Sequence, residues 1–358
     1  MKGLLPKSLP RVWAPPVKCQ GIKTKLVDFI ARSIVWDGVG RWIEPFLGSG
    51  VVLFNLLPER CLASDTNAHI IRLYQDIQTG AVTPKAVRDY LTQAGAELAK
   101  HGGDYYYAVR RQFNEEGGSL RLLFLNRSCF NGVMRFNSRG DFNVPFGHKP
   151  ARFSKAYVTK IANQVAKAAS AMAGRDWVFR TQDWRTTLKQ ASPEDFVYLD
   201  PPYIGRHTDY YNQWTEEDAQ ALARVAHDLP CGVALSMWKE NRYRENGHLA
   251  ASWADYVWRE FSHFYHVGPT ENLRNQMTEV LAIKPGWQAD SESQPVLRKA
   301  TPATGRRVAV LLNPAQLGFA LRDRARTARP ALAAEPELAI VRDRPAYARR
   351  RTRSRKRG

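Results

Sequence analysis

Short apolar runs alternate with segments of helical period along the first 286 residues of the chain. The apolar runs predict strands at 41–46, 60–65, 177–181, 196–200, 231–237, 255–261 and 278–284. Apolar residues at helical spacing predict helices at 24–36, 51–57, 70–77, 84–125, 154–173, 183–190 and 215–228. This alternation favours an α/β fold with a doubly wound, mostly parallel sheet.

Two parts of the chain depart from this alternation. Residues 126–150 are rich in Asn, Arg, Gly and Phe, have no helical period and are too long for a connector, so they indicate a functional insertion. Residues 287–306 are polar, 308–321 predict one helix, and the end, ARRRTRSRKRG, is a basic run of low complexity. We expect most of this tail to be disordered.

The charge of the chain points to a polyanionic partner. Its formal net charge is +19, and residues 287–358 contribute 17 Lys and Arg against 6 Asp and Glu. The four cysteines are far apart and lack metal-ligand spacing, so we expect neither a disulfide nor a metal. No apolar run reaches the ~18 residues of a membrane span, and the amino terminus has no signal-peptide pattern. We therefore expect a cytoplasmic protein without membrane contact.

The stretch YLDPPY at 198–203 combines an acid, two prolines and an aromatic ring directly after a predicted strand. Pro201 and Pro202 end the strand and hold the turn rigid. Asp200 and the carbonyl of Pro201 can then accept hydrogen bonds from an exocyclic amine on a nucleobase. Tyr203 can stack on that base. An amine held in this way can attack a methyl group, which favours a catalytic site over a rigid solvent turn.

A second candidate site follows the first predicted strand. In EPFLGSG, Gly48 and Gly50 let the backbone approach a ligand at a helix amino terminus, although an ordinary tight turn explains them equally well. Asp65 ends the next strand, where an acid accepts from ribose hydroxyls or caps the following helix. The loop has no Lys-Ser/Thr pair, which argues against a nucleoside triphosphate. A nucleoside with a carboxylate, such as S-adenosylmethionine, suits it.

Stretches in the same order along the chain resemble the Dam-type family of adenine-N6 DNA methyltransferases. They are PPVKCQGIKTKL (15–26), IEPFLGSGVVLFN (43–55), ASDTN (63–67), FLNRSCFNGVMRFNSRGDFNVPFGHKP (124–150), TQDW (181–184), YLDPPY (198–203) and TEVLAIKPG (278–286). The resemblance implies a Rossmann-like methyltransferase fold with a seven-stranded type of sheet, S-adenosylmethionine as cofactor and double-stranded DNA as partner. It implies a catalytic domain at 1–83 and 151–286, with a mainly helical DNA-recognition region inserted at 84–150. The tail at 287–358 has no counterpart in it.

The resemblance also implies which residues bind the cofactor. These are Cys19, Lys23, Phe46, Gly48, Gly50, Asp65, Asp183 and Asp200. Among them, Asp183 is expected to accept from the cofactor adenine. The family's first motif reads Lys-Trp-x-Gly-Gly-Lys, whereas residues 18–23 read Lys-Cys-Gln-Gly-Ile-Lys. Cys19 thus replaces the aromatic ring and Ile22 replaces a glycine, a departure that favours weaker stacking on the cofactor.

Residues 126–150 resemble the family's DNA-reading loop. The implied DNA-binding residues are Lys18, Phe130, Asn131, Arg135 and Asn137. Arg135 can pair with guanine O6 and N7, the two asparagines can contact bases or phosphates, and Phe130 can fill the space that a flipped base leaves. Local alternatives stay open, because Asn131 and the glycine after it also form a turn and Phe130 also suits a core. The basic tail favours nonspecific attraction to phosphates.

The leading hypothesis is a monomeric, S-adenosylmethionine-dependent enzyme that methylates N6 of adenine in duplex DNA. Methylation of an RNA base or a protein amide by the same turn is the alternative activity, and the insertion favours duplex DNA over both. A catalytically weak DNA-binding protein is the alternative outside catalysis, because Cys19 and Ile22 depart from the family motif. Restriction–modification, protection of a phage or mobile element, and housekeeping roles all stay open.

Overall fold

The computed structural model describes residues 3–203, 214–241, 244–264 and 276–290. The chain divides into two units, residues 1–296 and 297–358, and all of the described residues belong to the first. The helix predicted at 308–321 and the basic end of the chain therefore lie outside the described residues.

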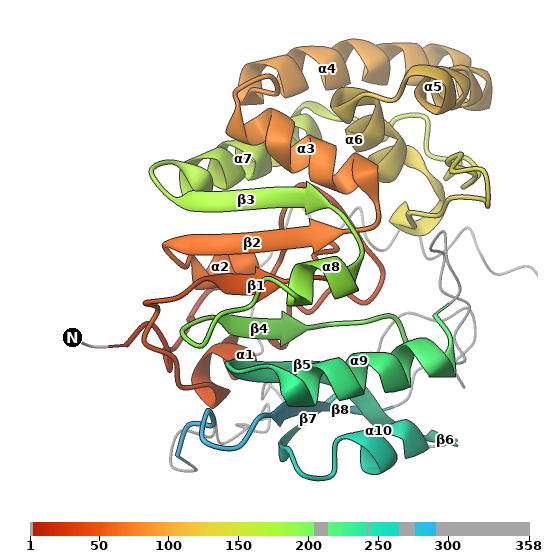
Figure 1. The fold of residues 1–358 in the computed structure, drawn as a ribbon. Helices are drawn as coiled ribbons and strands as arrows, with labels where there is room; N and C mark the ends of the chain where they lie inside the picture. Colours follow the sequence, from red (N-terminus) through yellow and green to blue (C-terminus); the bar gives the residue numbers. More distant parts are fainter. Residues whose placement is uncertain (1–2, 204–213, 242–243, 265–275, 291–358) are drawn as a thin grey trace, which may run out of the picture. The chain divides into compact units, whose positions relative to one another are not determined.

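A mixed sheet forms the centre of the first unit (Figure 1). Its strands run in the order β3-β2-β1-β4-β5-β8-β7, and the short β6 pairs with β5. Neighbours from β3 to β5 are parallel, whereas β8 is antiparallel to both β5 and β7. The strands are β1 Trp42–Glu44, β2 Arg60–Asp65, β3 Asp176–Thr181, β4 Phe196–Leu199, β5 Gly232–Asn241, β6 Arg244–Glu245, β7 Val257–Phe264 and β8 Gln276–Ile283. The predicted α/β fold with a doubly wound, mostly parallel sheet is confirmed, and all seven predicted strands are present.

Side chains cap the first turn of several helices. Asn67, Thr83, Ser154 and Thr215 each accept hydrogen bonds from backbone N–H groups of the first turn that follows. The helices are α1 Val27–Ser33, α2 Leu53–Leu56, α3 Ala68–Gln78, α4 Pro84–His101, α5 Gly103–Glu116, α6 Ser119–Ser128, α7 Lys155–Met172, α8 Trp184–Leu188, α9 Glu216–Asp228 and α10 Gly247–Ser252. Every helix predicted before residue 287 is present, whereas β6 and α10, each a few residues long, were not predicted.

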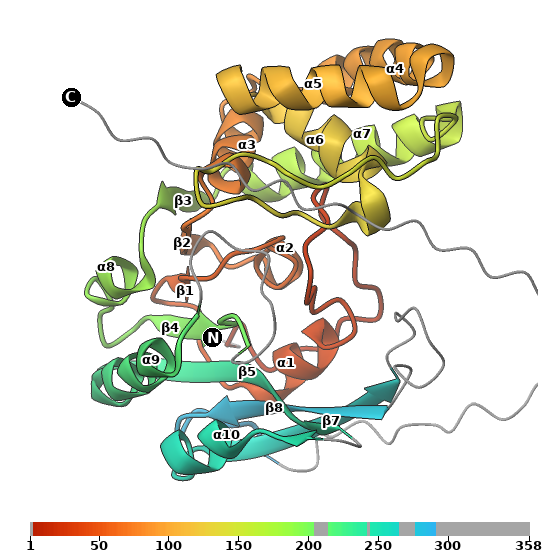
Figure 2. The ribbon, with the colours of Figure 1, turned by 90° about the vertical axis from the view of Figure 1, so that its right-hand side faces the viewer.

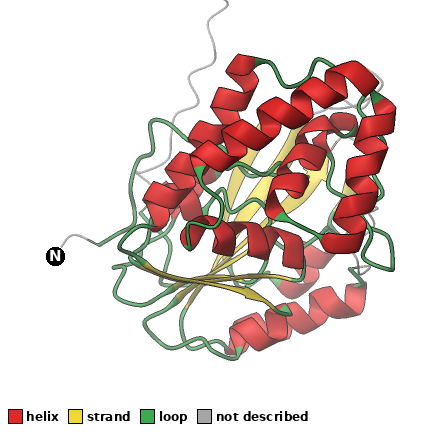
Figure 3. Ribbon diagram, turned by 90° about the horizontal axis from the view of Figure 1, so that it is seen from above, coloured by secondary structure: helices red, strands yellow, loops and turns green. Residues whose placement is uncertain are grey.

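Alternate residues along the central strands face two different hydrophobic cores, as the two-residue period of a strand requires. Trp42, Phe196 and Tyr198 belong to the core that also contains residues of α1 to α7. Ile43 and Val197 belong to the core shared with α8, α9 and α10. Figure 2 shows α1 and α2 on one side of the sheet and α8 and α9 on the other, and Figure 3 shows the strands enclosed between helices.

Helices α4, α5 and α6 occupy the predicted insertion and pack with α3 and α7 beyond the β3 edge of the sheet (Figure 1). Gly102 and Gly117, with φ of 56° and 71°, end α4 and α5 and so divide the predicted helical region. The segment after α6 holds a 3₁₀ turn at Phe130–Gly132 and two isolated bridges, Cys129–Phe146 and Phe136–Phe142. The division of this region from the catalytic domain at residues 84 and 150 stays a prediction.

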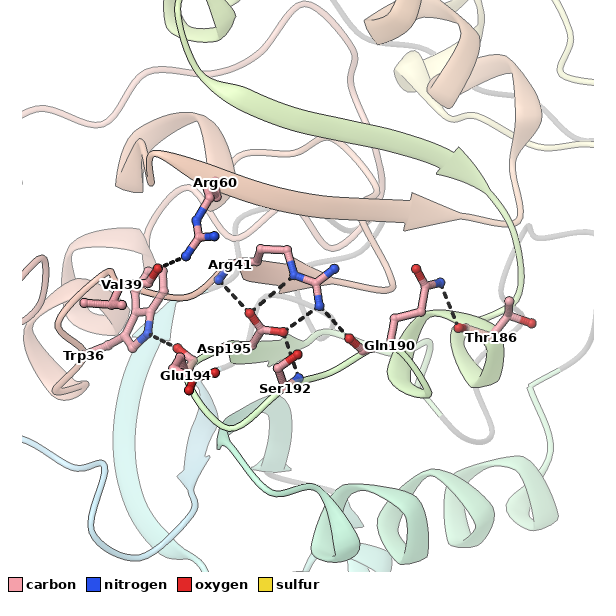
Figure 4. A network of polar contacts seen from close by, with 9 residues as sticks. All are labelled: Trp36, Val39, Arg41, Arg60, Thr186, Gln190, Ser192, Glu194 and Asp195. Atoms are coloured by element: carbon pink, nitrogen blue, oxygen red, sulfur yellow. Dashed lines mark hydrogen bonds and ion pairs between the residues drawn. The ribbon is translucent and has the colours of Figure 1, made fainter.

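An ion pair joins β1 to β4 at their amino ends (Figure 4). Arg41 precedes β1, and its guanidinium lies 2.7 Å from the carboxylate of Asp195, which precedes β4. The same carboxylate accepts from the N–H groups of Arg41 and Ser192 at 2.7 and 2.9 Å. Gly40 passes so close to the next turn that a Cβ there would lie 1.9 Å from the Glu194 carbonyl oxygen. This tie fixes the two strands whose opposite ends carry the candidate site.

Residues 287–290 pack within the first unit, although the basic tail was predicted to begin at 287. The Trp287 ring lies 5.7 Å from the Phe196 ring, and Ala289 donates its N–H to the Ser33 carbonyl oxygen at 2.9 Å. These four residues are therefore ordered, and the rest of the predicted tail lies outside the described residues. Among the described helices, none is long and apolar enough to cross a membrane.

Candidate active site

The strand order brings predicted site residues to one edge of the sheet. β1 pairs with β2 on one side and with β4 on the other, so the strand order reverses between β1 and β4. In doubly wound sheets, ligands bind at such a point, beside the carboxyl ends of the strands. Asp65 ends β2, Gly48 follows β1 and Asp200 follows β4, so all three lie at this edge.

The predicted cofactor-site lysine contacts the catalytic turn directly. Lys23 is 3% exposed, and its Nζ lies 2.9 Å from Asp200 Oδ1 and 2.8 Å from the Tyr203 hydroxyl oxygen. Nζ also donates to the Gly21 carbonyl oxygen at 3.1 Å and lies 5.0 Å from the centroid of the Tyr203 ring. The ammonium group therefore joins two motifs that are far apart in the sequence.

Burial and neighbouring charges set the ionisation of this cluster. Burial disfavours the Lys23 ammonium, but Asp200, Tyr203 and Glu279 together more than offset this, and the pKa of Lys23 is raised well above its ordinary value. Burial raises the pKa of Asp200 to about 6, while Lys23 opposes that shift. Asp200 is thus ionised at neutral pH and becomes protonated in mildly acidic solution.

Two buried acids that the sequence analysis did not assign lie around this cluster. Glu279 on β8 is 4% exposed, and its Oε2 lies 3.9 Å from Lys23 Nζ. Glu44, the last residue of β1, accepts from Trp42 Nε1 at 2.7 Å, and burial raises its pKa to about 8. Glu44 is therefore mostly protonated at neutral pH. Each is an acid within an otherwise apolar strand, and this contrast in the sequence could have marked both as candidate site residues.

Asp65 holds the glycine loop in place. Its carboxylate accepts from the backbone N–H groups of Gly48 and Asn67, at 2.9 and 2.8 Å. The cap of α3 is Asn67, so the alternative in which Asp65 caps this helix is wrong. Gly48 and Gly50 have φ of 50° and 68°, which glycine adopts without strain. A Cβ on Gly48 would meet no atom within 4 Å, whereas one on Gly50 would press on the Phe54 ring, 2.9 Å away.

Two other predicted cofactor residues lie around α8. The Phe46 ring lies 6.5 Å from the Trp184 ring and 5.5 Å from the Trp214 ring. Asp183 is exposed and caps α8, because its carboxylate accepts from the Arg185 N–H at 2.8 Å. Asp183 therefore has a structural role at the start of this helix, and its contact with a cofactor stays a prediction.

The structure accommodates both departures from the family's first motif. Gly21 has φ of 70° and keeps glycine where the backbone requires it, whereas Ile22, 37% exposed, adopts no such conformation. Cys19 is half-buried, and burial together with the Asp65 carboxylate raises the pKa of its thiol. The Cys19 thiol is therefore protonated at neutral pH, and Ile22 adds no backbone strain.

Lys18 ties the same motif to the predicted DNA-reading loop. Its N–H donates to Asn126 Oδ1 and its carbonyl oxygen accepts from Asn126 Nδ2, both at 2.9 Å. Its side chain passes Gly132, where a Cβ would lie 2.9 Å from Lys18 Cδ. The catalytic cluster and the loop are thus joined through residues 18–23. Asn126, which is fully buried and makes this link, was not predicted.

The start of the loop resolves two of the local alternatives. Phe130 is 51% exposed, so the alternative of a core residue is wrong. Asn131 has φ of 54°, so the alternative of an Asn-Gly turn at 131–132 is confirmed. An exposed aromatic ring on a tight turn can enter a groove, and its contact with DNA stays a prediction.

Arg135 and Asn137 both have partners within the loop. Arg135 Nε donates to Asn143 Oδ1 at 2.7 Å. Asn137 Oδ1 accepts from the N–H groups of Arg139 and Asp141, both at 2.9 Å, and Asn137 Nδ2 donates to Asp141 Oδ2 at 3.0 Å. The Asn137 amide therefore shapes the turn at 137–141. Arg139, with 82% of its side chain exposed at this turn, was not predicted.

Comparison with known proteins identifies the family. Residues 20–263 match the family model described as D12 class N6 adenine-specific DNA methyltransferase. This chain belongs to that family. The resemblance noted in the sequence is confirmed, and with it the assignment of the protein as a DNA adenine methyltransferase with a Rossmann-like fold.

Curated relatives support the same assignment. The DNA adenine methylase of Serratia marcescens is 34% identical over 223 residues, covering 60% of this chain and 77% of that protein. The DNA adenine methylase of Escherichia coli K12 is 32% identical over 227 residues, covering 60% of this chain and 75% of that protein. A type II methyltransferase of Methanocaldococcus jannaschii is 28% identical over 225 residues, covering 57% and 74%.

Proposed function

We propose that this chain transfers a methyl group from S-adenosylmethionine to N6 of adenine in duplex DNA, with Asp200 and Pro201 holding the amine. The family defines methylation of adenine in DNA, and the donor, the duplex and the residue roles are our proposal. The observation that carries it is the contact of Lys23 with Asp200 and Tyr203 at the carboxyl end of β4, where the strand order reverses.

The residues at this edge fit S-adenosylmethionine, which when bound supplies a methyl group activated by a positively charged sulfur. The open space beside Gly48 leaves room for a ligand against the loop backbone. Asp65 ends β2, where an acid accepts from ribose hydroxyls. Phe46 offers an apolar ring beside α8. Cys19 in place of an aromatic residue predicts a cofactor held with less stacking.

The DPPY turn supplies the acceptors for the target amine. The adenine amine is a weak nucleophile because its lone pair is delocalised into the ring. When Asp200 and the Pro201 carbonyl accept its two N–H groups, the nitrogen can become pyramidal and form a bond to the methyl carbon, while the bond from that carbon to the donor sulfur breaks and leaves a neutral thioether. The nitrogen then loses one proton on the side where these acceptors lie. Lys23 keeps Asp200 ionised for this role, and Tyr203 stacks on the base.

We assign recognition of the duplex to the loop at 126–150. Phe130 is exposed on a tight turn, as a ring that replaces a flipped base must be. Arg135 carries a guanidinium that matches guanine O6 and N7. Lys18 lies beside the same turn and offers a charge to a phosphate. The net charge of +19 supports a nucleic-acid partner.

Replacement of Asp200 tests this proposal. Asp200→Ala removes one preorganised acceptor, and loss of such a group typically lowers the rate about 10²- to 10³-fold. Asp89→Ala, which removes an acid whose side chain is 59% exposed on α4, serves as the matched control and should leave the rate unchanged. Transfer of labelled methyl from S-adenosylmethionine to DNA would be measured, with thermal unfolding as the fold control. Near-normal transfer by a folded Asp200→Ala protein would show that the assignment is wrong.

The same assay separates the alternatives when RNA and protein are offered beside DNA. Label in an RNA base or a protein amide would favour the alternative activity. DNA binding without any transfer would favour a catalytically weak DNA-binding protein, with Cys19 as the first residue to replace by an aromatic. The monomeric state and the cytoplasmic location stay predictions.

A further inference from the structure

Four aromatic rings join the start of α3 to the proposed DNA-reading loop. The His69 imidazole stacks on the Phe136 ring, with centroids 5.2 Å apart and planes at 10°, and lies 4.7 Å from the Phe113 ring of α5. The Phe142 ring meets Phe136 and Phe113 edge to face, at 5.5 and 6.2 Å. The three phenylalanines are buried and His69 is half-buried. Burial lowers the pKa of His69, so the stacked ring is neutral at neutral pH.

This cluster anchors the hairpin that carries the proposed base-reading arginine. Phe136 and Phe142 pair as an antiparallel bridge. Successive residues of an extended segment point to opposite faces, so Arg135 and Asn137 point away from the cluster that holds Phe136. The contact of Phe136 with His69 therefore sets how far the hairpin at 135–143 stands from α3.

His69 is itself held by the edge of the sheet. Its N–H donates to Asn67 Oδ1 at 3.1 Å, and the Asn67 N–H donates to Asp65 Oδ1 at 2.8 Å. Asp65 in turn accepts from the N–H of Gly48. Contacts thus run without a gap from the glycine loop after β1, through Asp65, Asn67 and His69, to the ring of Phe136.

We propose that His69 is a positioning residue for DNA recognition, whose ring holds the 135–143 hairpin at a set distance from the sheet edge that carries Asp65 and Asp200. The purpose of that distance is to let Arg135 meet its base while the target adenine lies at the DPPY turn. The inference rests on the proposed DNA-reading role of this loop. His69 itself contacts the hairpin and α5, and its effect on the reaction passes through Phe136.

Two substitutions at one position separate stacking from bulk. His69→Ala removes the ring, and His69→Phe restores a ring that can stack on Phe136. Methylation rates would be compared on the preferred DNA site and on single-base variants of it. We expect His69→Ala to lower the ratio of preferred to variant rates by about three- to tenfold, the size of one aromatic pair, with unchanged affinity for S-adenosylmethionine. His69→Phe should restore the ratio.

A second histidine provides the matched control. His227 also packs on two aromatic rings, 5.6 Å from Trp253 and 5.0 Å from Tyr256, but it lies on α9 near α10. His227→Ala should therefore cost comparable packing and leave the rate ratio unchanged. An unchanged ratio in a folded His69→Ala protein would overturn the proposal. If His69→Ala does not fold, His69→Leu fills the space without an aromatic ring and is measured in its place.

Hydrogen exchange without DNA distinguishes this inference from the proposed function. Amides of 135–143 should exchange faster in His69→Ala than in the wild type, and His227→Ala should leave them unchanged. Unchanged exchange would overturn the positioning role, whether or not the wild type methylates DNA. If exchange is faster in His69→Ala but the wild type fails to methylate DNA, the proposed function is overturned. The contact by which His69 positions the hairpin is then still supported.

Discussion

The charge on Lys23 should set the pH at which the rate of methyl transfer rises. Asp200 has to be ionised to accept from the target amine, and its pKa of about 6 lies above the ordinary value because it is buried. The rate should therefore rise with pH, with about a tenth of Asp200 ionised at pH 5 and about nine tenths at pH 7. Lys23→Met removes the cation 2.9 Å from Asp200 and so should move this rise to higher pH.

The size of that shift follows from the contact. An opposite charge at such a distance lowers the pKa of a carboxyl by about 1–3 units, so its loss should place the rise between about pH 7 and 9. At pH 7, the rate of Lys23→Met should then fall by about twofold to a hundredfold and recover as the pH is raised. Glu279→Gln should shift the rise the other way, because the Glu279 carboxylate raises the pKa of Asp200.

Single-turnover methyl transfer between pH 5 and 9 measures both shifts. Saturating DNA and S-adenosylmethionine separate the effect on Asp200 from any loss of cofactor affinity, and thermal unfolding at each pH verifies the fold. A Lys23→Met protein whose rate rises at the wild-type pH, or lower, would refute the reasoning. The same shift direction in Lys23→Met and Glu279→Gln would refute it too, because the two substitutions remove opposite charges.

Two further predictions concern recognition and stability. Arg135→Ala should lose about 1–3 kcal/mol of discrimination at one guanine position. Methylation rates on the best site and on its single-base variants measure this loss, and an equal fall of the rate on all of these sites would make Arg135 a phosphate contact. Gly40→Ala should destabilise the fold by about 1–3 kcal/mol, because its Cβ would lie 1.9 Å from the Glu194 carbonyl oxygen. Gly247→Ala is the control, since its Cβ would meet no atom within 4 Å, and equal melting temperatures of the two variants would contradict the prediction.

The fold could be predicted wherever a pattern repeats over many residues. The strand expected at 60–65 is β2, and the strand expected at 196–200 is β4, because apolar β-forming residues end in polar turns at both places. The pair β6 and α10 escaped prediction because two to six residues show no period. The helical region at 84–125 was predicted as a whole. It is divided at Gly102 and Gly117, where the backbone takes positive φ, and the sequence does not show which of its glycines do so.

Residue patterns alone predict the candidate site as separate pieces, and the family resemblance is what groups Lys23 with Asp200 before the structure is known. Asp200 and Tyr203 are neighbours in one short turn, so their shared chemistry is visible in the sequence. Lys23 and Glu279 join them from an amino-terminal loop and from β8, and a contact between residues so far apart cannot be predicted from sequence spacing. The contact of Asn137 with DNA stays a prediction, and its amide also closes a turn inside the loop, which depends on where Asp141 comes to lie.

The sequence by itself determined the order and type of the elements, the rigid DPPY turn and the family, because these depend on residues close together along the chain. The tertiary structure decided which charged side chains lie close enough to shift one another's pKa, and which aromatic rings support the hairpin at 135–143. Burial of Lys23 beside two carboxylates arises when the amino-terminal loop packs against β8 and the end of β4, and the stack of His69 on Phe136 arises when α3 packs against the loop at 126–150. Electrostatic and packing energies depend on distance in space, and that distance is set by the folded chain.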